Sequence, residues 1–499
     1  MALVTHPAAD DLTTLTSVLN GFAGRRVLCV GDVMLDRFIY GETKRISPEA
    51  SVPILRITRE ASELGGAGNV VRNIVALGGG CAFVSVIGDD RAGTEITQHF
   101  AKLSQVEPYV RVSPERETTV KTRFISDDNG HNLLRADRET TVALSPKDAA
   151  DLKQNAVAQV AEVDAVILSD YAKGVLMGDI AAAVIAAARK ANKPVIVDPK
   201  GSDYSRYAGA NLITPNRNEL ADATDMPLDD DESVIAAARS ICERTSVDGI
   251  LVTRSKRGMT LVAGNGAVYD FAAEARDVAD VTGAGDTVVA TLALALAAGA
   301  SLPTATRLAN VAAGIVVGRR GTAVVTAQDI GASLLRSGLS HAEQKVANRE
   351  SAVAKIASWR TQDLKIGFTN GCFDLLHPGH ISLLRQARLA CDRLVVGLNS
   401  DASVRRLKGE ARPIQSEAAR AAVMASLADV DLVVVFGEDT PQALIEALRP
   451  DVLVKGADYK RENVVGGDFV EGYGGRVVLA DVVPSYSTTA TVAAMKTAR

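Results

Sequence analysis

The sequence predicts two α/β domains in tandem, each built on a doubly wound parallel sheet, with a small β lid on the first. The length of 499 residues exceeds what a single hydrophobic core usually supports. Short apolar runs alternate with Ala-rich helical stretches, which is the pattern of βαβ units. Aromatic residues are only 4 % of the chain although 47 % is apolar. That composition favours buried parallel strands over an antiparallel sandwich.

The first half contains six predicted strands of the main sheet. Each is a short apolar run bounded by polar or turn residues. Helices are predicted over 180–192 and 233–242, and the apolar stretch 288–298 is expected to be a core helix. The strands are expected at residues 26–31, 82–88, 165–169, 194–198, 212–214 and 250–253.

Two segments of the first half break this alternation. Residues 38–59 and 109–126 are rich in Thr, Arg, Val and Ile with period-two character. We expect strands that stand off the main sheet and act as a lid. A β-hairpin without a functional role is the alternative.

The domain boundary is predicted within residues 337–362, which are polar and helical without a strand-like run. We therefore expect a first domain over 1–336, a helical linker over 337–362 and a second domain over 363–499. Further strands are predicted at residues 365–369, 393–399, 432–436, 452–455 and 476–479.

Charge and cysteine usage exclude several classes of protein. A net charge of −5 argues against a nucleic-acid or membrane-surface partner, so any anion site must be local. The start of the chain does not resemble a signal peptide, and the longest apolar run, 288–300, is too short to cross a bilayer. The five cysteines are scattered without metal or disulfide spacing, which predicts reduced thiols and a cytoplasmic location: Cys29, Cys81, Cys242, Cys372 and Cys391.

The most specific motif of the first half is Gly283-Ala284-Gly285-Asp286 at the start of an apolar helix. Backbone amides at a helix start, together with the helix dipole, form an anion site. Asp286 at its mouth is placed to accept a proton from a substrate hydroxyl that attacks phosphorus. A glycine-rich turn in which Asp286 caps the helix is the alternative.

Two further motifs support a phosphotransfer site. The glycine-rich turn with Gly65, Gly66 and Asn69 allows backbone to approach a polyhydroxyl ligand. The segment Asn216-Arg217-Asn218-Glu219 follows a predicted strand end, where ligands of parallel sheets bind. Its Glu219 suits an indirect magnesium role, and its Asn and Arg side chains suit phosphate. A polar loop with Asn216 as helix cap is the alternative.

Four residues are candidates for holding the sugar. Asp32 follows the first strand and is placed to bind hydroxyls, or it caps a helix. Lys173 lies past another strand end and is placed to hold a substrate phosphate, unless it is a solvated lysine. Lys121 and Arg123 of the presumed lid are candidates for the same phosphate, with lid surface charge as the alternative.

The second half opens with a strand followed by Thr369 to His380 and then a helix. His377 and His380, three residues apart, are expected together at the helix N-terminus, where imidazoles can hydrogen-bond nucleotide phosphates. Pro378 suits the first helical turn. A metal-binding pair and a purely structural pair are the alternatives.

Across about the first 330 residues the motifs resemble the ribokinase-like (PfkB) carbohydrate kinases. The resemblance implies that Asp286 is the catalytic base, that Gly283 and Gly285 form the anion hole, and that Asn216 to Glu219 serve ATP and magnesium. The second half resembles the HxGH cytidylyltransferase-like nucleotidyltransferases, which implies catalytic roles for His377 and His380. The matching nucleotide-binding candidates are Asn370, Gly371, Phe373, Asp374, Lys408, Arg412, Lys455, Gly456, Ser487, Thr488 and Thr489.

The order of the two halves resembles a family of bifunctional bacterial enzymes. These phosphorylate D-glycero-β-D-manno-heptose 7-phosphate to the 1,7-bisphosphate and transfer the adenylyl group of ATP to heptose 1-phosphate. The resemblance implies ATP at both sites, Mg²⁺, a homodimer, and ADP-heptose production for the lipopolysaccharide core. A separate phosphatase must act between the two steps. A tandem enzyme for another sugar phosphate or for CTP, and a pseudoenzyme that only binds nucleotide, are the alternatives.

Overall fold

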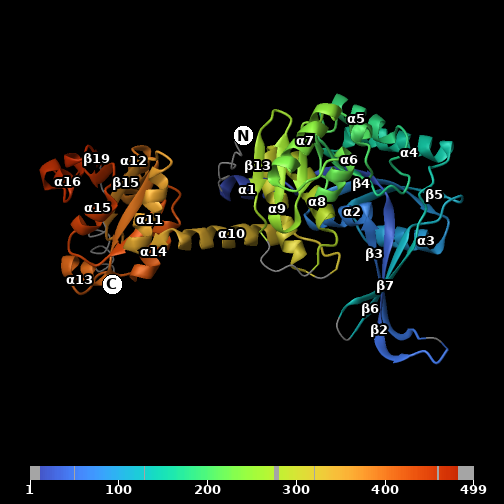
Figure 1. The fold of residues 1–499 in the computed structure, drawn as a ribbon, viewed down its shortest axis with the longest axis horizontal. Helices are drawn as coiled ribbons and strands as arrows, with labels where there is room; N and C mark the ends of the chain where they lie inside the picture. Colours follow the sequence, from blue (N-terminus) through green and yellow to red (C-terminus); the bar gives the residue numbers. More distant parts are fainter. Residues whose placement is uncertain are drawn as a thin grey trace. The chain divides into compact units, whose positions relative to one another are not determined.

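A computed structural model describes residues 12–49, 51–127, 130–274, 280–319, 321–457 and 460–481. The chain divides into two compact units, Met1–Leu334 and Leu335–Arg499. Each unit contains its own sheet with helices on both faces (Figure 1). The fold class predicted from the sequence is confirmed.

The first unit is built on a nine-stranded sheet of order β13-β12-β11-β10-β9-β8-β1-β4-β5. The pairs β11–β12 and β12–β13 are antiparallel and the other pairs are parallel. All six predicted strands are present, whereas the edge strands β5 and β13 and the neighbouring β12 were not predicted for this sheet. The strands are β1 (Arg26–Gly31), β4 (Gly80–Gly88), β5 (Val106–Ser113), β8 (Ala165–Ser169), β9 (Val195–Asp198), β10 (Leu212–Ile213), β11 (Gly249–Thr253), β12 (Met259–Ala263) and β13 (Val268–Phe271).

Helices bury both faces of this sheet. One face packs against α1 (Leu12–Asn20), α2 (Ala67–Ala76), α3 (Arg91–Phe100), α8 (Ala284–Ala297) and α9 (Leu302–Val317). The other packs against α4 (Pro146–Gln159), α5 (Ile180–Lys190), α6 (Arg217–Thr224) and α7 (Asp231–Thr245). Ten consecutive residues of α8, from Asp286 to Ala295, are buried, which explains why its sequence lacks a polar face.

A four-stranded sheet stands off the body of the first unit, and we call it the lid sheet (Figure 1). It has the order β3-β2-β6-β7 and consists of β2 (Val33–Ile46), β3 (Pro53–Gly66), β6 (Val120–Ser126) and β7 (Asn132–Arg138). The prediction for 38–59 is confirmed. The prediction for 109–126 is wrong in its first part, because residues 109–113 belong to β5, which extends the main sheet by pairing with β4.

The second unit is built on a six-stranded parallel sheet of order β14-β17-β16-β15-β18-β19. Helices α12 (Pro378–Leu389) and α14 (Glu417–Ala425) cover one face. Helices α11 (Arg349–Arg360), α15 (Gln442–Leu448) and α16 (Gly467–Gly472) cover the other. The strands are β14 (Val346–Ala347), β15 (Ile366–Gly371), β16 (Arg393–Asn399), β17 (Leu432–Phe436), β18 (Val452–Gly456) and β19 (Arg476–Ala480).

The predicted linker contains a strand that the sequence did not suggest. Helix α10 (Ala327–Gln344) is followed by β14, which pairs with β17. Ala352 and Ile356 of α11 are buried in the second unit's core. Residues 346–360 are therefore part of that unit's fold.

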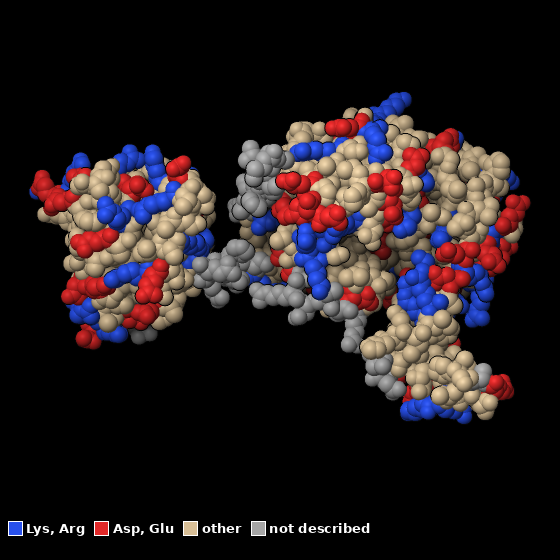
Figure 2. Space-filling view, in the orientation of Figure 1, with Lys and Arg blue, Asp and Glu red and all other residues tan. Residues whose placement is uncertain are grey.

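Acidic and basic side chains are interspersed over the visible face of each unit (Figure 2). Among the described helices, none has the length and apolar character needed to span a bilayer.

Candidate active sites

Asp286 lies in the first turn of α8 and is buried, with 6 % of its surface exposed. Its Oδ2 accepts a hydrogen bond of 2.7 Å from Asn69 Nδ2, and its Oδ1 accepts one of 2.7 Å from the Tyr171 hydroxyl. The helix cap is Gly283, so the interpretation of Asp286 as the cap is wrong. Asn69, predicted as a sugar contact, thus reaches the candidate base directly.

The surroundings of Asp286 suit a proton acceptor. The pKa of Asp286 is raised to about 6: burial raises it, the hydrogen bonds from Asn69 and Tyr171 lower it, and the nearby carboxylate of Asp36 raises it. A carboxylate with a pKa in this range is ionised at neutral pH yet accepts a proton more readily than an exposed one.

Gly65, Gly66 and Gly283 near Asp286 leave no room for a Cβ, because neighbouring side chains lie too close to the backbone there. Gly283 has φ of 80°, and a Cβ there would lie 2.7 Å from Asn69 Nδ2. At Gly65 a Cβ would lie 2.2 Å from Asp36 Oδ2, and Gly66 has φ of 57° at the cap of α2. Any larger residue would move Asn69 or Asp36.

Asp32 organises a loop rather than a helix end. Its Oδ2 accepts the amides of Tyr171 at 2.9 Å and Lys173 at 3.0 Å, and its Oδ1 accepts the amide of Val175 at 3.0 Å. This loop follows β8, and Asp32 follows β1. The two strands are neighbours in the sheet, and the strands next to them lie on opposite sides of this pair. This is the crevice at which doubly wound sheets bind ligands. Both oxygens of Asp32 are engaged, which favours a positioning role over a direct sugar contact.

The basic candidates Lys121, Arg123 and Lys173 lie around the same crevice. Lys121 Nζ is 5.6 Å from the centre of the Tyr171 ring, and burial lowers its pKa. Arg123 Nη1 bonds Asp36 Oδ1 at 2.6 Å, so Arg123 is committed to that carboxylate. Lys173 Nζ pairs with Glu139 at 2.9 Å and its side chain is only 14 % exposed. It is not the solvated lysine of the alternative interpretation.

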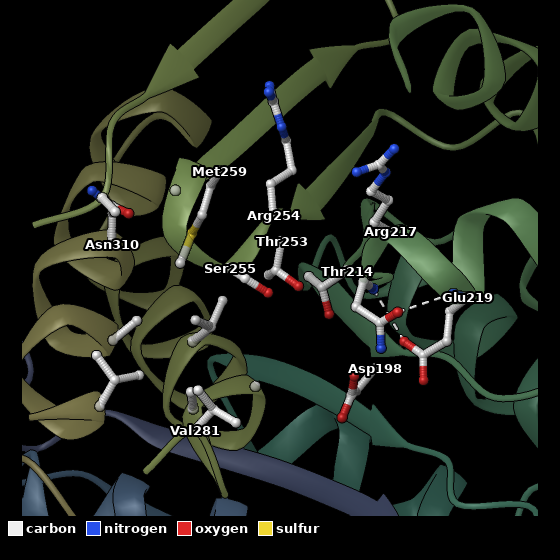
Figure 3. A pocket seen from close by; sticks show the side chains of 18 of the residues that line it. Asp198, Thr214, Arg217, Glu219, Thr253, Arg254, Ser255, Met259, Val281 and Asn310 are labelled. Atoms are coloured by element: carbon white, nitrogen blue, oxygen red, sulfur yellow. Dashed lines mark hydrogen bonds between the residues drawn. The ribbon is translucent and has the colours of Figure 1, made fainter. Parts of the chain in front are cut away.

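A cavity of about 1090 Å³ lies at the start of α8, the helix that carries Asp286, and Tyr171 also lines it. Ala284 and Gly285 line it, so the start of α8 faces it as predicted. Met259, Val281 and Asn310 lie on one side of this space, and Arg217, Glu219 and Asp198 on the other (Figure 3). An apolar wall opposite a polar one suits a nucleotide, with its base on the first and its phosphates near the second.

The segment 216–219 both caps helix α6 and lines this cavity, two roles between which the sequence did not decide. Asn216 caps α6 by accepting the Glu219 amide at 3.0 Å, while Glu219 Oε2 accepts the Asn216 amide at 3.0 Å. Glu219 Oε1 also binds Lys200 Nζ at 2.9 Å. The capping interpretation is therefore correct, and all four residues from Asn216 to Glu219 nevertheless line the cavity.

Asp198 is a cavity residue that sequence analysis missed. It ends β9, and burial together with the carboxylates of Asp286 and Glu219 raises its pKa well above the usual range. This concentration of carboxylates, which Lys200 offsets only in part, favours a cation. Its position at the end of a predicted strand was the available signal. Among the described residues no three His, Cys, Asp or Glu are placed to hold a metal by themselves.

In the second unit the two histidines meet as predicted. His377 caps α12 with Pro378 following, and the His377 and His380 rings stack with centres 3.8 Å apart. The Nδ1 atoms of both are buried without a hydrogen-bond partner in the described part of the chain. Burial lowers the pKa of His380 to about 4, helped by His377 and Lys408, and burial also lowers that of His377. Both imidazoles are neutral at pH 7 and available for a ligand.

Asp374 and Arg412 form a buried pair next to the histidines. Arg412 Nε bonds Asp374 Oδ2 at 2.5 Å, and Asp374 also accepts the amides of Ile414 and Gln415. Although burial opposes it, these amide bonds and Arg412 lower the pKa of Asp374. Arg412 Nη2 has no partner in the described part of the chain and is buried. Asp374 thus holds Arg412 while leaving one donor for an anion.

The remaining nucleotide candidates surround the carboxyl ends of β15 and β18. Asn370 and Gly371 end β15, Lys455 and Gly456 end β18, and Lys455 Nζ bonds the Asn370 carbonyl at 3.4 Å. The strand order reverses between β15 and β18, so this edge is the second unit's ligand crevice. Phe373 packs 5.2 Å from His380, and Lys408 lies exposed at the end of α13 (Asp401–Lys408). Ser487, Thr488 and Thr489 lie outside the described residues.

Arg420 is a residue whose role the sequence did not give. It is fully buried and binds Asp401 at 2.7 Å and the carbonyls of Cys372 at 2.6 Å and Asn399 at 2.9 Å. It thereby holds the segment before the histidines against β16.

Comparisons with known proteins agree with this arrangement. The pfkB family carbohydrate kinase model matches residues 25–328, and the cytidylyltransferase-like model matches residues 368–494. Phosphofructokinase-2 from Escherichia coli in complex with potassium aligns with a TM-score of 0.53 and 23 % identity, covering 63 % of this chain and 99 % of its own. At that identity the likeness supports the fold alone.

Two relatives match almost end to end. The bifunctional protein HldE of Rhodospirillum rubrum is 58 % identical over 484 residues, 97 % of either chain. That of Paramagnetospirillum magneticum is 54 % identical over 97 % of this chain and 99 % of its own. The chain therefore belongs to the family of bifunctional HldE proteins, in which a pfkB family carbohydrate kinase is followed by a cytidylyltransferase-like domain.

Proposed function

We propose that this protein catalyses two ATP-dependent steps on a heptose. The kinase phosphorylates the anomeric hydroxyl of D-glycero-β-D-manno-heptose 7-phosphate to give the 1,7-bisphosphate. The nucleotidyltransferase transfers the adenylyl group of ATP to heptose 1-phosphate and releases pyrophosphate. The observation that carries the kinase step is the buried Asp286, which is bonded by Tyr171 from the loop that Asp32 holds and whose neighbours Ala284 and Gly285 line the nucleotide cavity.

In the kinase, Asp286 takes the proton of the sugar hydroxyl as its oxygen attacks the γ-phosphorus of ATP. ATP occupies the cavity lined by Ala284 and Gly285, whose helix start stabilises phosphate charge. The sugar lies in the crevice near Asn69, Gly65 and Gly66, with its own phosphate toward Lys121 and Lys173. These two lysines supply positive charge at the lid side.

Mg²⁺ accompanies ATP and neutralises charge on its phosphates. Asp198 is the side chain best suited to receive it, because it lines the cavity, and burial and the carboxylates of Asp286 and Glu219 raise its pKa with only a partial offset from Lys200. Glu219 acts indirectly, since its oxygens are engaged by Asn216 and Lys200.

In the nucleotidyltransferase, His377 and His380 donate hydrogen bonds to the phosphates of ATP during attack by the sugar phosphate on the α-phosphorus. Arg412, Lys408 and Lys455 supply positive charge around them. Asn370, Gly371, Phe373, Asp374 and Gly456 shape the site. No covalent enzyme intermediate is needed, because the sugar phosphate is itself the nucleophile.

We assign the kinase to residues 1–336 and the transferase to the second unit, in which residues 346–360 of the predicted linker join the fold of 363–499. The product of the first reaction carries phosphate at positions 1 and 7, whereas the second reaction uses the 1-phosphate. A separate phosphatase must therefore act in between. Both reactions consume ATP, which supports a cytoplasmic location.

We also propose a homodimer formed through the lid sheet. Its exposed apolar residues Ile46, Ile57 and Leu134 are 69 %, 52 % and 60 % accessible and would be covered by a second copy. Sedimentation of the wild type and of Ile57→Lys should give a dimer and a monomer, respectively.

The decisive test uses the two sites as controls for each other. Purified protein is given heptose 7-phosphate with ATP, and separately heptose 1-phosphate with ATP or CTP, while product mass and pyrophosphate are followed. Asp286→Asn should abolish the bisphosphate and spare pyrophosphate release. His380→Ala should do the reverse. Retained kinase activity in Asp286→Asn, or equal use of CTP, would overturn the corresponding assignment.

A further inference from the structure

Tyr171 contacts the candidate base from the opposite side to the glycine turn. Its hydroxyl donates to Asp286 Oδ1 at 2.7 Å, while Asn69 donates to Oδ2 at 2.7 Å. The carboxylate is thus held by one donor on each oxygen. Tyr171 stands two residues before the predicted phosphate contact Lys173, and sequence analysis gave it no role.

We propose that Tyr171 is a positioning residue of the kinase: its phenol fixes the orientation of Asp286 and favours its ionised form. This inference rests on the proposed role of Asp286 as base. Two donors, one on each oxygen, fix the plane of the carboxylate. Each oxygen keeps a further lone pair, and one of these two lone pairs accepts the proton of the sugar hydroxyl.

The phenol acts as a donor and not as an acid or base. Burial, together with the charges of Asp286 and Asp198, raises the pKa of Tyr171 well above its usual value, so the hydroxyl keeps its proton. During the reaction the sugar oxygen forms its bond to the γ-phosphorus and the bond to the ADP oxygen breaks. The hydroxyl proton passes to Asp286, and Tyr171 remains protonated throughout.

The position of Tyr171 is itself set by the sugar crevice. Asp32 accepts the Tyr171 amide at 2.9 Å, and Lys121 of the lid sheet lies over its ring at 5.6 Å. Tyr171 therefore connects the loop after β8 and the lid sheet to the base. A substrate that moves Lys121 or this loop would also adjust Asp286.

Other charged and titratable groups act on Asp286 as well, and they are unchanged by substitution at Tyr171. Asp36 on β2 raises its pKa and Lys121 on β6 lowers it. Asp198 on β9 and Cys29 on β1 interact with it electrostatically. Removing the Tyr171 hydroxyl therefore removes one anion-favouring donor against a constant background.

The test is the pH profile of the kinase in Tyr171→Phe. We expect kcat to fall about tenfold with little change in the KM for ATP, and the acidic limb of the profile to move up by about one pH unit. Replacing Tyr171 with 3-fluorotyrosine, a stronger donor that keeps the ring and hydroxyl, should move the acidic limb to lower pH.

Tyr207→Phe is the matched control. Tyr207 is a buried tyrosine of the same unit whose hydroxyl donates to Asp170 at 2.6 Å, and it does not contact Asp286. Its loss should lower thermal stability without moving the acidic limb. If Tyr171→Phe folds and its limb stays at the wild-type pH, or moves no more than that of Tyr207→Phe, the inference is wrong. Asp286→Asn separates the two claims, because only its retained activity would overturn the base itself.

Discussion

At the scale of single residues, burial decides the chemistry of both sites. Asp286 has 6 % of its surface exposed and a pKa raised to about 6, whereas burial lowers the pKa of His380 to about 4. The same desolvation acts on both, and it favours the neutral form in each case. The carboxylate thus becomes a better proton acceptor, and the imidazole remains an uncharged hydrogen-bonding group.

The kinase should lose activity on the acidic side of neutrality. Below about pH 6 Asp286 becomes protonated and can no longer accept the hydroxyl proton, so kcat/KM should fall about tenfold per pH unit below that value. A pH series from 5 to 8 with heptose 7-phosphate measures this. An acidic limb near pH 4 would mean that the base is not desolvated as described.

The pH profile of adenylyl transfer by the same protein should show no acidic limb near pH 6. His380 stays neutral down to about pH 4, so its protonation cannot reduce the rate between pH 5 and 8. Assaying pyrophosphate release on the preparations used for the kinase series compares the two sites directly. Parallel acidic limbs near pH 6 would contradict the separate environments of Asp286 and His380.

Residue identities in the motifs were predictable, but their partners were not. Asp286 and the two histidines follow from helix-start motifs read along the chain. Asp198 and Tyr171 have no local motif, and only the packing of β9 and of the loop after β8 brings them to Asp286. Asp32 was predicted to bind hydroxyls or to cap a helix, whereas its engagement by three amides depends on a loop about 140 residues away.

At the scale of elements, the turn before α8 couples backbone conformation to the base. Gly283→Ala would place a methyl group 2.7 Å from Asn69 Nδ2 at a φ of 80°. We expect a loss of about 1–2 kcal/mol of stability from the backbone strain and a loss of kinase activity, because Asn69 must leave Asp286. Unfolding by denaturant together with the kinase assay measures both.

Gly299→Ala is the control for that strain. Gly299 has φ of 86°, and a Cβ there meets nothing within 4 Å. It should lose similar stability and keep kinase activity. Equal loss of activity in both variants would show that strain, and not displacement of Asn69, is responsible.

The central strands were predictable because burial on both faces makes them continuous apolar runs. Strand β13 is a short antiparallel strand at one edge, and β7 is exposed along its whole length, so neither carries such a run. Strand β12 lies inside the sheet and is buried from Met259 to Val262, so its apolar run was a signal that sequence analysis missed. Strand β5 was mistaken for a lid strand because it lies at the other edge of the main sheet and is only partly buried. The strand β14 has only two residues, below what any periodicity can reveal.

At the scale of the whole molecule, each unit buries its own hydrophobic clusters, so damage to one should spare the other. Arg420→Met would leave Asp401 and the carbonyls of Cys372 and Asn399 without their buried partner. We expect a loss of about 3–5 kcal/mol in the second unit. Heat inactivation of adenylyl transfer should occur at lower temperature, with the kinase profile unchanged.

Arg406→Met provides the comparison for Arg420→Met. Arg406 pairs with Asp439 at 2.7 Å on the same unit, but both side chains are about half exposed or more. Loss of this ion pair should lower the free energy of unfolding of the second unit by about 0–1 kcal/mol. A heat-sensitive kinase in Arg420→Met would show that the units do not unfold independently.

The parallel register of β2 and β6 restricts which sequence changes can alter the sugar specificity of this enzyme. Asp36 lies opposite Lys121, and Phe38 opposite Arg123, so the two basic side chains leave the same side of β6. Inserting or deleting one residue in that strand would turn both away from the crevice and present Thr122 instead. New substrate preferences are therefore expected to arise through exchanges of side chains, or through changes of two residues at once, and not through single-residue indels in this strand.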